Sequence, residues 1–422
     1  MSRFLYTLTI WLLIPWALLH LLWRARRQPE YLRHWGERFG SYAANPVESP
    51  PTIWLHAVSV GETRAAQPLV ALLRQRWPQH RILFTHMTPT GRQTSTEIFG
   101  DSGAVCRVYL PYDCPVSMRA FLRHFKPVIG IVMETELWPN LIAACHDKKI
   151  PLLLVNARLS EKSARRYARF PALMREALLG LSAIAAQSAA GAARFRELGA
   201  GEVGIYGNLK FDIEPPQEQL QLGKELRALW NVGNRPLLLA ASTRDGEEAL
   251  LLDAFAKQPP SSLLLVIVPR HPQRFDEVAA LITAHGLRMQ RRSENVALRT
   301  ETQVLLGDSM GEMFAYYAAS DIAFIGGSLL DYGSQNLIEA CVVGVPLLLG
   351  PSTYNFAEAA EAALVCGAAQ RIKHAEDVFN EAARLLGDAP VRERMSDAGK
   401  AFAGAHRGAS RKTLELVEKF LP

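Results

Sequence analysis

The sequence predicts an α/β protein with two doubly wound domains, a cleft between them and an N-terminal membrane helix. Three observations support this fold class. An uncharged apolar stretch opens the chain, apolar runs then alternate with helical stretches, and a proline-bearing break divides that alternation into two series. The 422 residues are 49% hydrophobic and 21% charged, which is enough to bury the cores of two domains.

The first element is the apolar stretch at residues 4–23, which carries no formal charge and is long enough to span a bilayer as a helix. Pro15 inside it is tolerated in membrane helices. Arg24, Arg26 and Arg27 follow at once, so the rest of the chain should be cytoplasmic. We expect residues 1–27 to be an uncleaved anchor or a helix lying in the interface. A cleaved signal peptide is the competing interpretation, but no small-residue cleavage site follows.

The charge and cysteine content limit the partners and the compartment. The net charge is +6, and residues 1–40 contribute six Arg against two Glu. An excess beside the apolar stretch favours an anionic lipid surface, and we expect no nucleic-acid partner. Residues 31–39 could add an interfacial helix there, although packing at the surface explains this segment as well. The five scattered cysteines form no CxxC pair, which fits a reducing, cytoplasmic compartment.

The first alternating series predicts a domain at residues 28–212. Its apolar runs are separated by stretches long enough for right-handed crossover helices. The expected strands are 53–55, 82–85, 105–109, 128–133, 152–156, 183–186 and 203–206.

The second series predicts a domain at residues 213–422, after a linker at 211–221 that contains Pro215 and Pro216. Two similar halves joined by such a hinge predict a ligand cleft between them. The expected strands are 237–240, 263–268, 303–306, 322–325 and 346–349, and the expected helices are 247–257, 275–285, 313–318, 335–341, 356–363 and 391–421, the last interrupted at 404–408.

Glu62 is the first candidate site residue. It ends the run IWLHAVSVGE, which predicts a buried strand, a tight turn and then a helix. Ligands bind at the carboxyl ends of strands in open α/β sheets, and a carboxylate there can act as a general base. A carboxylate near a helix N-terminus can equally be a cap.

Other polar residues follow strands of the first series. Residues 87–91 (MTPTG) favour a helix cap over a ligand loop. Glu134 and Glu136 lie in METELWPN, where acids are costly unless solvated or paired. Lys210, in GNLKFD at the domain junction, could face the cleft or be an ordinary surface lysine. The candidate partners for the two acids lie in the segment NARLS, and they are Asn156, Arg158 and Ser160.

The second series has three such segments. Arg270 and His271 lie between two prolines in PRHP, and an Arg fork suits a phosphate or carboxylate. Residues 307–312 (GDSMGE) lead into a helix whose first N–H groups could bind an anion, although the spacing matches neither a P-loop nor GxGxxG. After residues 326–328 (GGS), Asn336 and Glu339 share a helix face, where they could bind a ribose or cap the helix.

Together and in this order, these segments resemble the 3-deoxy-D-manno-octulosonic acid (Kdo) transferases of Gram-negative bacteria. The resemblance runs from the anchor to about residue 356. It implies a GT-B fold of two Rossmann-like domains tethered to the cytoplasmic face of the inner membrane. It also implies transfer of Kdo from CMP-Kdo to the lipid A precursor, with inversion and without a metal or other cofactor.

The resemblance also assigns roles to individual residues. It makes Glu62 the general base and gives transition-state support to Glu134 and Lys210. It places CMP against Pro269, Arg270, Met310, Gly311, Glu312, Asn336, Leu337, Ile338 and Glu339.

One segment departs from the family pattern. Residues 333–339 read GSQNLIE, with Ser334 in place of a Gly and Leu337 in place of a Pro. Asn336 and Glu339 remain, so we expect an intact nucleotide site. No Asp-x-Asp pair, which could hold a metal ion, occurs in the chain. Fixed donors such as Arg270 and Lys210 would then neutralise the charge of the leaving group.

Three other functions remain open on the residues. One is a GT-B transferase that uses another nucleotide sugar, and one is a sugar-nucleotide 2-epimerase, which would need no anchor. A non-catalytic lipid-binding protein is the third, although acids and Arg gather at many strand ends.

Overall fold

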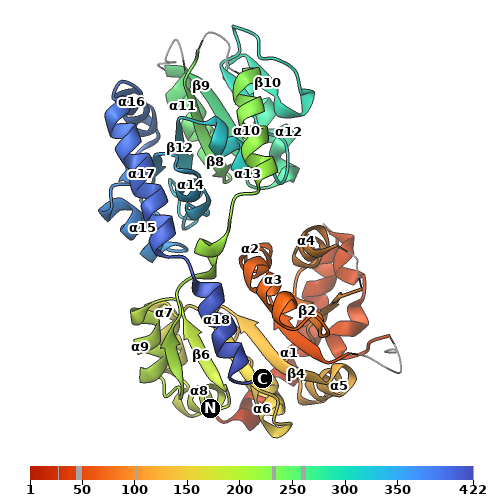
Figure 1. The fold of residues 1–422 in the computed structure, drawn as a ribbon. Helices are drawn as coiled ribbons and strands as arrows, with labels where there is room; N and C mark the ends of the chain where they lie inside the picture. Colours follow the sequence, from red (N-terminus) through yellow and green to blue (C-terminus); the bar gives the residue numbers. More distant parts are fainter. Residues whose placement is uncertain (27, 44–49, 101–102, 231–233, 258–262, 422) are drawn as a thin grey trace. The chain divides into compact units, whose positions relative to one another are not determined.

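The structure is a computed structural model that describes residues 1–26, 28–43, 50–100, 103–230, 234–257 and 263–421. Arg27, one of the basic residues after the apolar stretch, lies outside the described residues. The chain forms two compact units (Figure 1). The first contains residues 1–213 and 406–422, and the second contains residues 214–405.

The first unit is built on a parallel seven-stranded sheet in the order β3-β2-β1-β4-β5-β6-β7. The predicted strands of the first series are confirmed within one residue at either end. They are β1 (Thr52–His56), β2 (Arg81–His86), β3 (Val105–Tyr109), β4 (Pro127–Met133), β5 (Leu152–Ala157), β6 (Ala183–Ala186) and β7 (Val203–Ile205).

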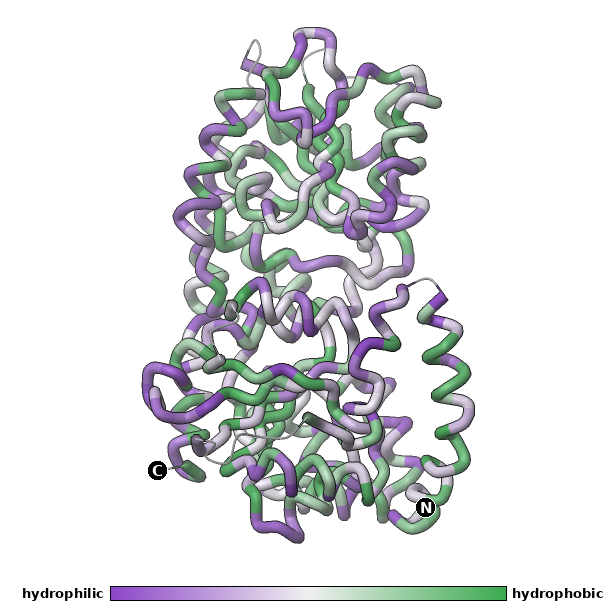
Figure 2. Tube along the Cα trace, turned by 90° about the vertical axis from the view of Figure 1, so that its right-hand side faces the viewer, coloured by the Kyte–Doolittle hydropathy of each residue, from purple (hydrophilic) through white to green (hydrophobic). Residues whose placement is uncertain are grey.

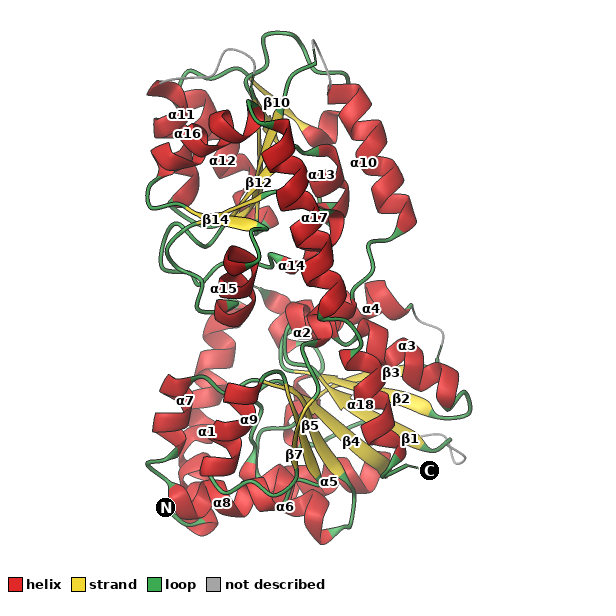
Figure 3. Cartoon of the chain, turned by 60° about the vertical axis from the view of Figure 1, so that its left-hand side comes forward, coloured by secondary structure: helices red, strands yellow, loops and turns green. Residues whose placement is uncertain are grey.

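Helices cover both faces of this sheet because successive side chains of a strand point to opposite sides. Helices α3 and α18 and helices α5 and α6 lie around the sheet in Figure 3. Ile53 and Leu55 of β1 pack with α3 and α18, whereas Trp54 packs on the other face with α5 and α6. The helices are α2 (Val60–Ala65), α3 (Gln67–Arg76), α4 (Pro89–Phe99), α5 (Pro115–Phe125), α6 (Pro139–Asp147), α7 (Glu161–Tyr167), α8 (Pro171–Leu179), α9 (Ala189–Glu197) and α18 (Ala409–Glu418), with the 3-10 turn η3 (Leu209–Asp212).

The N-terminal apolar stretch forms α1 (Arg3–Ala25), a largely hydrophobic helix (Figure 2). Among the described residues it is the one helix long and apolar enough to cross a membrane. The possible interfacial helix at residues 31–39 does not form as a single helix. Two 3-10 turns, η1 (Pro29–Leu32) and η2 (Trp35–Phe39), stand there instead, because His34 between them adopts a left-handed φ of 55° that no α-helix continues through.

The C-terminal segment corrects the predicted domain boundary, which placed all of residues 213–422 in the second domain. Helix α18 belongs to the first unit, where Leu416 and Val417 join the core of β1 and α3. The carboxylate of Asp212 accepts hydrogen bonds from the backbone N–H groups of Gly408, at 2.6 Å, and Ser410. Both the start of α18 and its apolar face are therefore held by the first unit.

The second unit also contains a parallel seven-stranded sheet, in the order β10-β11-β9-β8-β12-β13-β14. The predicted strands are confirmed, and the two edge strands were missed because their short segments are polar rather than apolar runs. The strands are β8 (Leu237–Thr243), β9 (Leu264–Pro269), β10 (Met289–Arg291), β11 (Val304–Leu306), β12 (Ile322–Ile325), β13 (Leu347–Leu349) and β14 (Ala369–Arg371).

Two predicted segments of this unit shift. The linker is shorter than 211–221, because a helix already begins at Gln217. The helix expected at 335–341 starts three residues later, at Ile338, whose N–H donates to the side chain of Asn336 just before the helix. The helices and 3-10 turns are α10 (Gln217–Trp230), α11 (Glu247–Lys257), η4 (Pro272–Arg274), α12 (Phe275–Ala284), η5 (Arg292–Glu294), α13 (Met313–Ala319), α14 (Ile338–Val343), α15 (Ala357–Val365), α16 (Ala375–Leu386) and α17 (Ala389–Ala405).

Candidate active site

The strand order of the first unit reverses between β1 and β4, and ligands of open α/β sheets bind outside the carboxyl ends of the strands at such a point. Strand β1 leads into the turn that carries Glu62, and β4 ends at Met133, directly before Glu134. The topology therefore places both acids, 72 positions apart in the numbering, at the edge where a ligand is expected.

Glu62 lies in the first turn of α2, next to the N-cap Ser59. Its Oε2 accepts a hydrogen bond from the Val58 N–H at 2.8 Å, and its Oε1 accepts one from the Ser59 hydroxyl at 2.9 Å. The side chain thus completes a reciprocal cap. Only 8% of Glu62 is exposed. Each carboxylate oxygen keeps a second lone pair, so capping leaves room for one more donor.

The surroundings of Glu62 suit a proton acceptor. Burial, and next the nearby carboxylate of Glu134, raise the pKa of Glu62 to about 7, while the hydrogen bonds from Val58 and Ser59 oppose the shift. A general base works best when its pKa lies near the working pH. The cap and the general base are therefore compatible roles for the same carboxylate.

Glu134 is paired with a cation from a distant segment. The Nζ of Lys210, in η3, lies 3.1 Å from Oε1 of Glu134, and both side chains are largely buried. Lys210 is therefore no ordinary surface lysine. Glu134 adopts a left-handed φ of 59°, which is strained for a residue with a Cβ and is typical of functional turns.

The candidate partners in NARLS serve other purposes. The Oδ1 of Asn156 accepts from the Leu209 N–H at 3.1 Å, which holds the turn that carries Lys210. Ser160 caps α7, and the backbone oxygen of Arg158 accepts from Thr135. Residues 87–91 also cap a helix, since the Thr88 hydroxyl accepts from the Gly91 N–H at 3.1 Å.

In the second unit, Arg270 lies just beyond β9, where its backbone N–H donates to the carbonyl of Thr243 at 3.0 Å. Its Nε donates to Oε1 of Gln335 at 3.2 Å. The predicted Arg270 and the predicted loop 333–339 therefore meet. The burial of His271 lowers its pKa, and so do the neighbouring guanidinium groups, so this side chain is neutral near pH 7.

The segment 307–312 follows β11 and precedes the seven-residue α13. Gly311 adopts a left-handed φ of 81°, and Met310 is exposed. The carboxylate of Glu312 accepts from the Ser309 hydroxyl at 2.6 Å and pairs with Arg292 at 3.2 Å. Its charge is therefore compensated within the unit.

The loop at residues 333–339 contains a strained backbone position at Ser334, where the resemblance leads to an expected Gly. Ser334 adopts a left-handed φ of 70°. Asn336 accepts from the Ile338 N–H at 3.1 Å and donates to Oε1 of Glu339 at 3.0 Å. Asn336 therefore takes the capping role, and Leu337 and Ile338 are buried behind it.

The sequence reasoning missed Glu247. This buried side chain begins α11 and accepts from the backbone N–H groups of Arg244 at 2.8 Å, Gly327 at 2.6 Å and Leu329 at 2.9 Å. It thus joins the ends of β8 and β12, where the second sheet reverses its strand order. The signal was present in RDGEE, which repeats the pattern of a strand, a Gly and an acid seen at Glu62.

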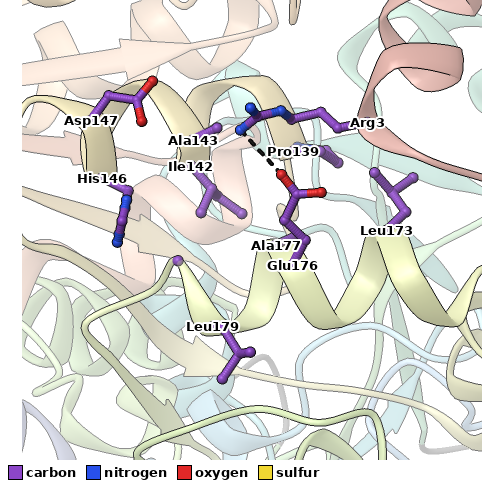
Figure 4. A pocket seen from close by; sticks show the side chains of 11 residues that line it. Arg3, Pro139, Ile142, Ala143, His146, Asp147, Leu173, Glu176, Ala177 and Leu179 are labelled. Carbon is purple, nitrogen blue, oxygen red and sulfur yellow. Dashed lines mark ion pairs between the residues drawn. The ribbon is translucent and has the colours of Figure 1, made fainter.

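One cavity of the first unit lies apart from these residues. It has a volume of about 300 Å³ between α1, α6 and α8, and its walls include Arg3, Ile142, His146 and Glu176 (Figure 4). None of the predicted site residues lines it. Across the described ranges, no group of three or more His, Cys, Asp or Glu side chains is arranged to hold a metal ion.

Solved structures share this fold. A glycosyltransferase from Rickettsia africae superposes with a TM-score of 0.60 at 14% identity, covering 89% of this chain and 99% of that structure. At that identity the likeness concerns the fold alone, and the fold is a GT-B-like pair of α/β units.

The sequence comparisons identify the family. The family model described as 3-deoxy-D-manno-octulosonic-acid transferase (kdotransferase) matches residues 33–213. The 3-deoxy-D-manno-octulosonic acid transferase of Bordetella pertussis is 41% identical over 100% of both chains, and that of Haemophilus influenzae is 39% identical over 100% of this chain and 99% of its own. The chain belongs to the Kdo transferase family and is a glycosyltransferase.

Proposed function

We propose that this transferase moves Kdo from CMP-Kdo to the lipid A precursor lipid IVA, with inversion and without a metal. Glu62 is the general base. The observation that carries this proposal is the buried carboxylate of Glu62, with a pKa of about 7, at the point where the sheet reverses its strand order.

In the proposed step, Glu62 takes the proton of an acceptor hydroxyl as its oxygen attacks the anomeric carbon of Kdo. The bond from that carbon to the phosphate oxygen breaks, and its electron pair leaves with CMP. A single displacement of this kind inverts the anomeric configuration. Lys210 and Glu134 support the transition state from the first unit.

The second unit holds the donor in this proposal. Arg270 neutralises the phosphate of the leaving CMP. Met310, Gly311 and Glu312 supply backbone and side-chain contacts to CMP, and so does the segment from Asn336 to Glu339. The helix α1 and the arginines beside it hold the enzyme on the cytoplasmic face of the inner membrane, where the lipid acceptor lies.

The experiment compares the wild type, Glu62→Gln, Glu62→Ala and the exposed control Glu161→Gln. Each is incubated with CMP-Kdo and tetra-acylated lipid A precursor in excess EDTA, and the lipid is analysed by mass spectrometry. The Gln side chain keeps an oxygen for the Val58 N–H but is no base. We therefore expect turnover to fall by about 10²–10⁴ in both Glu62 variants, with CMP affinity retained.

Near-wild-type turnover of Glu62→Gln would remove Glu62 as the base. No mass gain with the wild type, before and after magnesium is restored, would reject the proposed donor or acceptor. A gain only with magnesium would reject metal independence.

A further inference from the structure

A second cavity, of about 280 Å³, lies between the N-terminal helix and the loop that follows β4. Helix α1 contributes one wall and the segment after the acids contributes another. The apolar side chains that line it are Ile10, Leu13, Ile14, Ala17, Leu137 and Trp138. We call this space the helix cavity.

Polar contacts hold α1 against the first unit and so fix one wall of the helix cavity. The Tyr6 hydroxyl donates to Oδ2 of Asp113 at 2.9 Å, and the Thr7 hydroxyl donates to Oδ1 of Asn140 at 2.9 Å. Arg3 pairs with Glu176 of α8 at 3.2 Å (Figure 4). Asp113 is buried and also accepts from the N–H of Asn140. The wall therefore rests on partnered polar groups, of which Asp113 and Asn140 are buried.

The helix cavity is continuous with the exposed apolar face of α1. Leu13 lines the cavity, yet 48% of it is exposed. Next to it lie Leu12 and Trp16, which are 73% and 62% exposed. An exposed apolar stripe beside a cluster of arginines suits a hydrocarbon environment. The same environment therefore reaches the mouth of the cavity.

The opposite wall leads to the acids. The Nε1 of Trp138 donates to Oε2 of Glu136 at 2.6 Å. The negative charge of Glu136 helps to raise the pKa of Glu62. The charge of Glu134 likewise helps to raise the pKa of Glu136. One side chain thus lines the cavity and belongs to the network of the proposed base.

From these contacts we propose that the helix cavity binds a hydrocarbon chain of the lipid acceptor and so presents the acceptor's head group to Glu62. The inference rests on the proposed acceptor class. A chain bound there lies between α1 and Trp138, which line the same cavity. The cavity then selects acceptors by chain length, because each buried methylene contributes to affinity by up to about fourfold.

The test uses the full chain in mixed micelles of fixed acceptor fraction. The probes are tetra-acylated disaccharide acceptors with progressively shorter chains and one fully deacylated, water-soluble acceptor. Ala17→Trp fills the helix cavity, and Ile14→Ala enlarges it. Leu12→Trp is the control, because it also introduces a Trp on α1 but places it on the exposed stripe and leaves the lining intact.

For the wild type and Leu12→Trp, we expect KM to rise as the chains shorten, by up to about fourfold per methylene. In Ala17→Trp, KM for the longest chains should rise at least about tenfold and its dependence on length should flatten, with CMP affinity and turnover of the deacylated acceptor retained. Ile14→Ala should shift the preference to longer chains.

A KM independent of chain length in the wild type would overturn the inference. The same length dependence in Ala17→Trp, Ile14→Ala and Leu12→Trp would overturn it as well. Failure of the proposed function is a different result, since the wild type would then transfer Kdo to none of the acceptors.

Discussion

The ammonium group of Lys210 lies 3.1 Å from Oε1 of Glu134, although 76 positions separate the two residues. Lys210 reaches this position because Asn156 holds the N–H of Leu209, and Glu134 reaches it through a strained left-handed turn after β4. The pair places a compensated charge beside Glu62. It leaves the carboxylate of Glu134 close enough to raise the pKa of Glu62.

The first prediction concerns the pH dependence of turnover. A general base acts in its ionised form, and the pKa of Glu62 is about 7. We expect the logarithm of kcat/KM to rise with a slope of about one below pH 7 and to level off above it. A pH–rate profile of the wild type measures this. A flat profile from about two pH units below the pKa of Glu62 to about one unit above it would contradict the assignment.

The second prediction separates the causes of that pKa. Removing the charge of Glu134 in Glu134→Gln should lower the pKa of Glu62, and the rising limb should move to lower pH by up to about one unit. Lys210→Ala leaves the carboxylate of Glu134 without its cation and so raises the pKa of Glu62 further. The rising limb of the pH–rate profile of this variant should therefore move to higher pH. Glu97→Gln, exposed on α4, is the control. Shifts of the same sign in both variants would rule out this electrostatic account.

The third prediction concerns the donor site. Arg270→Ala should weaken CMP binding by about 10- to 100-fold, which is the usual contribution of a charge-assisted hydrogen bond. The CMP affinity of Arg270→Lys should lie between those of the wild type and Arg270→Ala, because lysine keeps the charge and loses the planar fork. Calorimetric titration with CMP measures both, with the exposed Arg384→Ala as the control. Unchanged CMP affinity in Arg270→Ala would exclude its proposed role.

The fourth prediction concerns Glu247 as a positioning residue. Glu247→Gln leaves one oxygen for three backbone N–H groups in a buried place, which should destabilise the second unit by about 1–3 kcal/mol. Because Gly327 contacts the loop that carries Gln335, CMP affinity should fall as well. Thermal unfolding and CMP titration measure the two effects. A lower Tm with wild-type CMP affinity would make Glu247 purely structural.

The fifth prediction concerns the return of α18 to the first unit. Asp212→Ala removes the acceptor for two N–H groups at the start of this helix and should destabilise its docking by about 1–2 kcal/mol. Hydrogen exchange at residues 409–418 should speed up. Asp388→Ala, which uncaps α17 of the second unit, should speed exchange at 389–405 only. Unchanged exchange in Asp212→Ala would show that apolar packing alone holds α18.

Much of the fold could be predicted because its signals are local. A buried parallel strand is a short apolar run, so twelve strands were found within a few residues, and β10 and β14 were missed because polar edge strands carry no such run. The capping of α4 by Thr88 was likewise predictable from its neighbours. The placing of Glu62 and Glu134 after their strands follows from the same local pattern.

By itself, the sequence determined the two parallel α/β units, the apolar helix and the residues that stand at strand ends, because periodicity and turn residues act over a few positions. Only the tertiary structure decided that Lys210 pairs with Glu134, that Glu247 joins two strand ends, that α18 belongs to the first unit and that α1 forms one wall of a cavity beside Trp138. Each of these depends on contacts between distant residues. The burial of these side chains and the charges around them depend on the order of the strands in each sheet, and no local sequence pattern encodes that order.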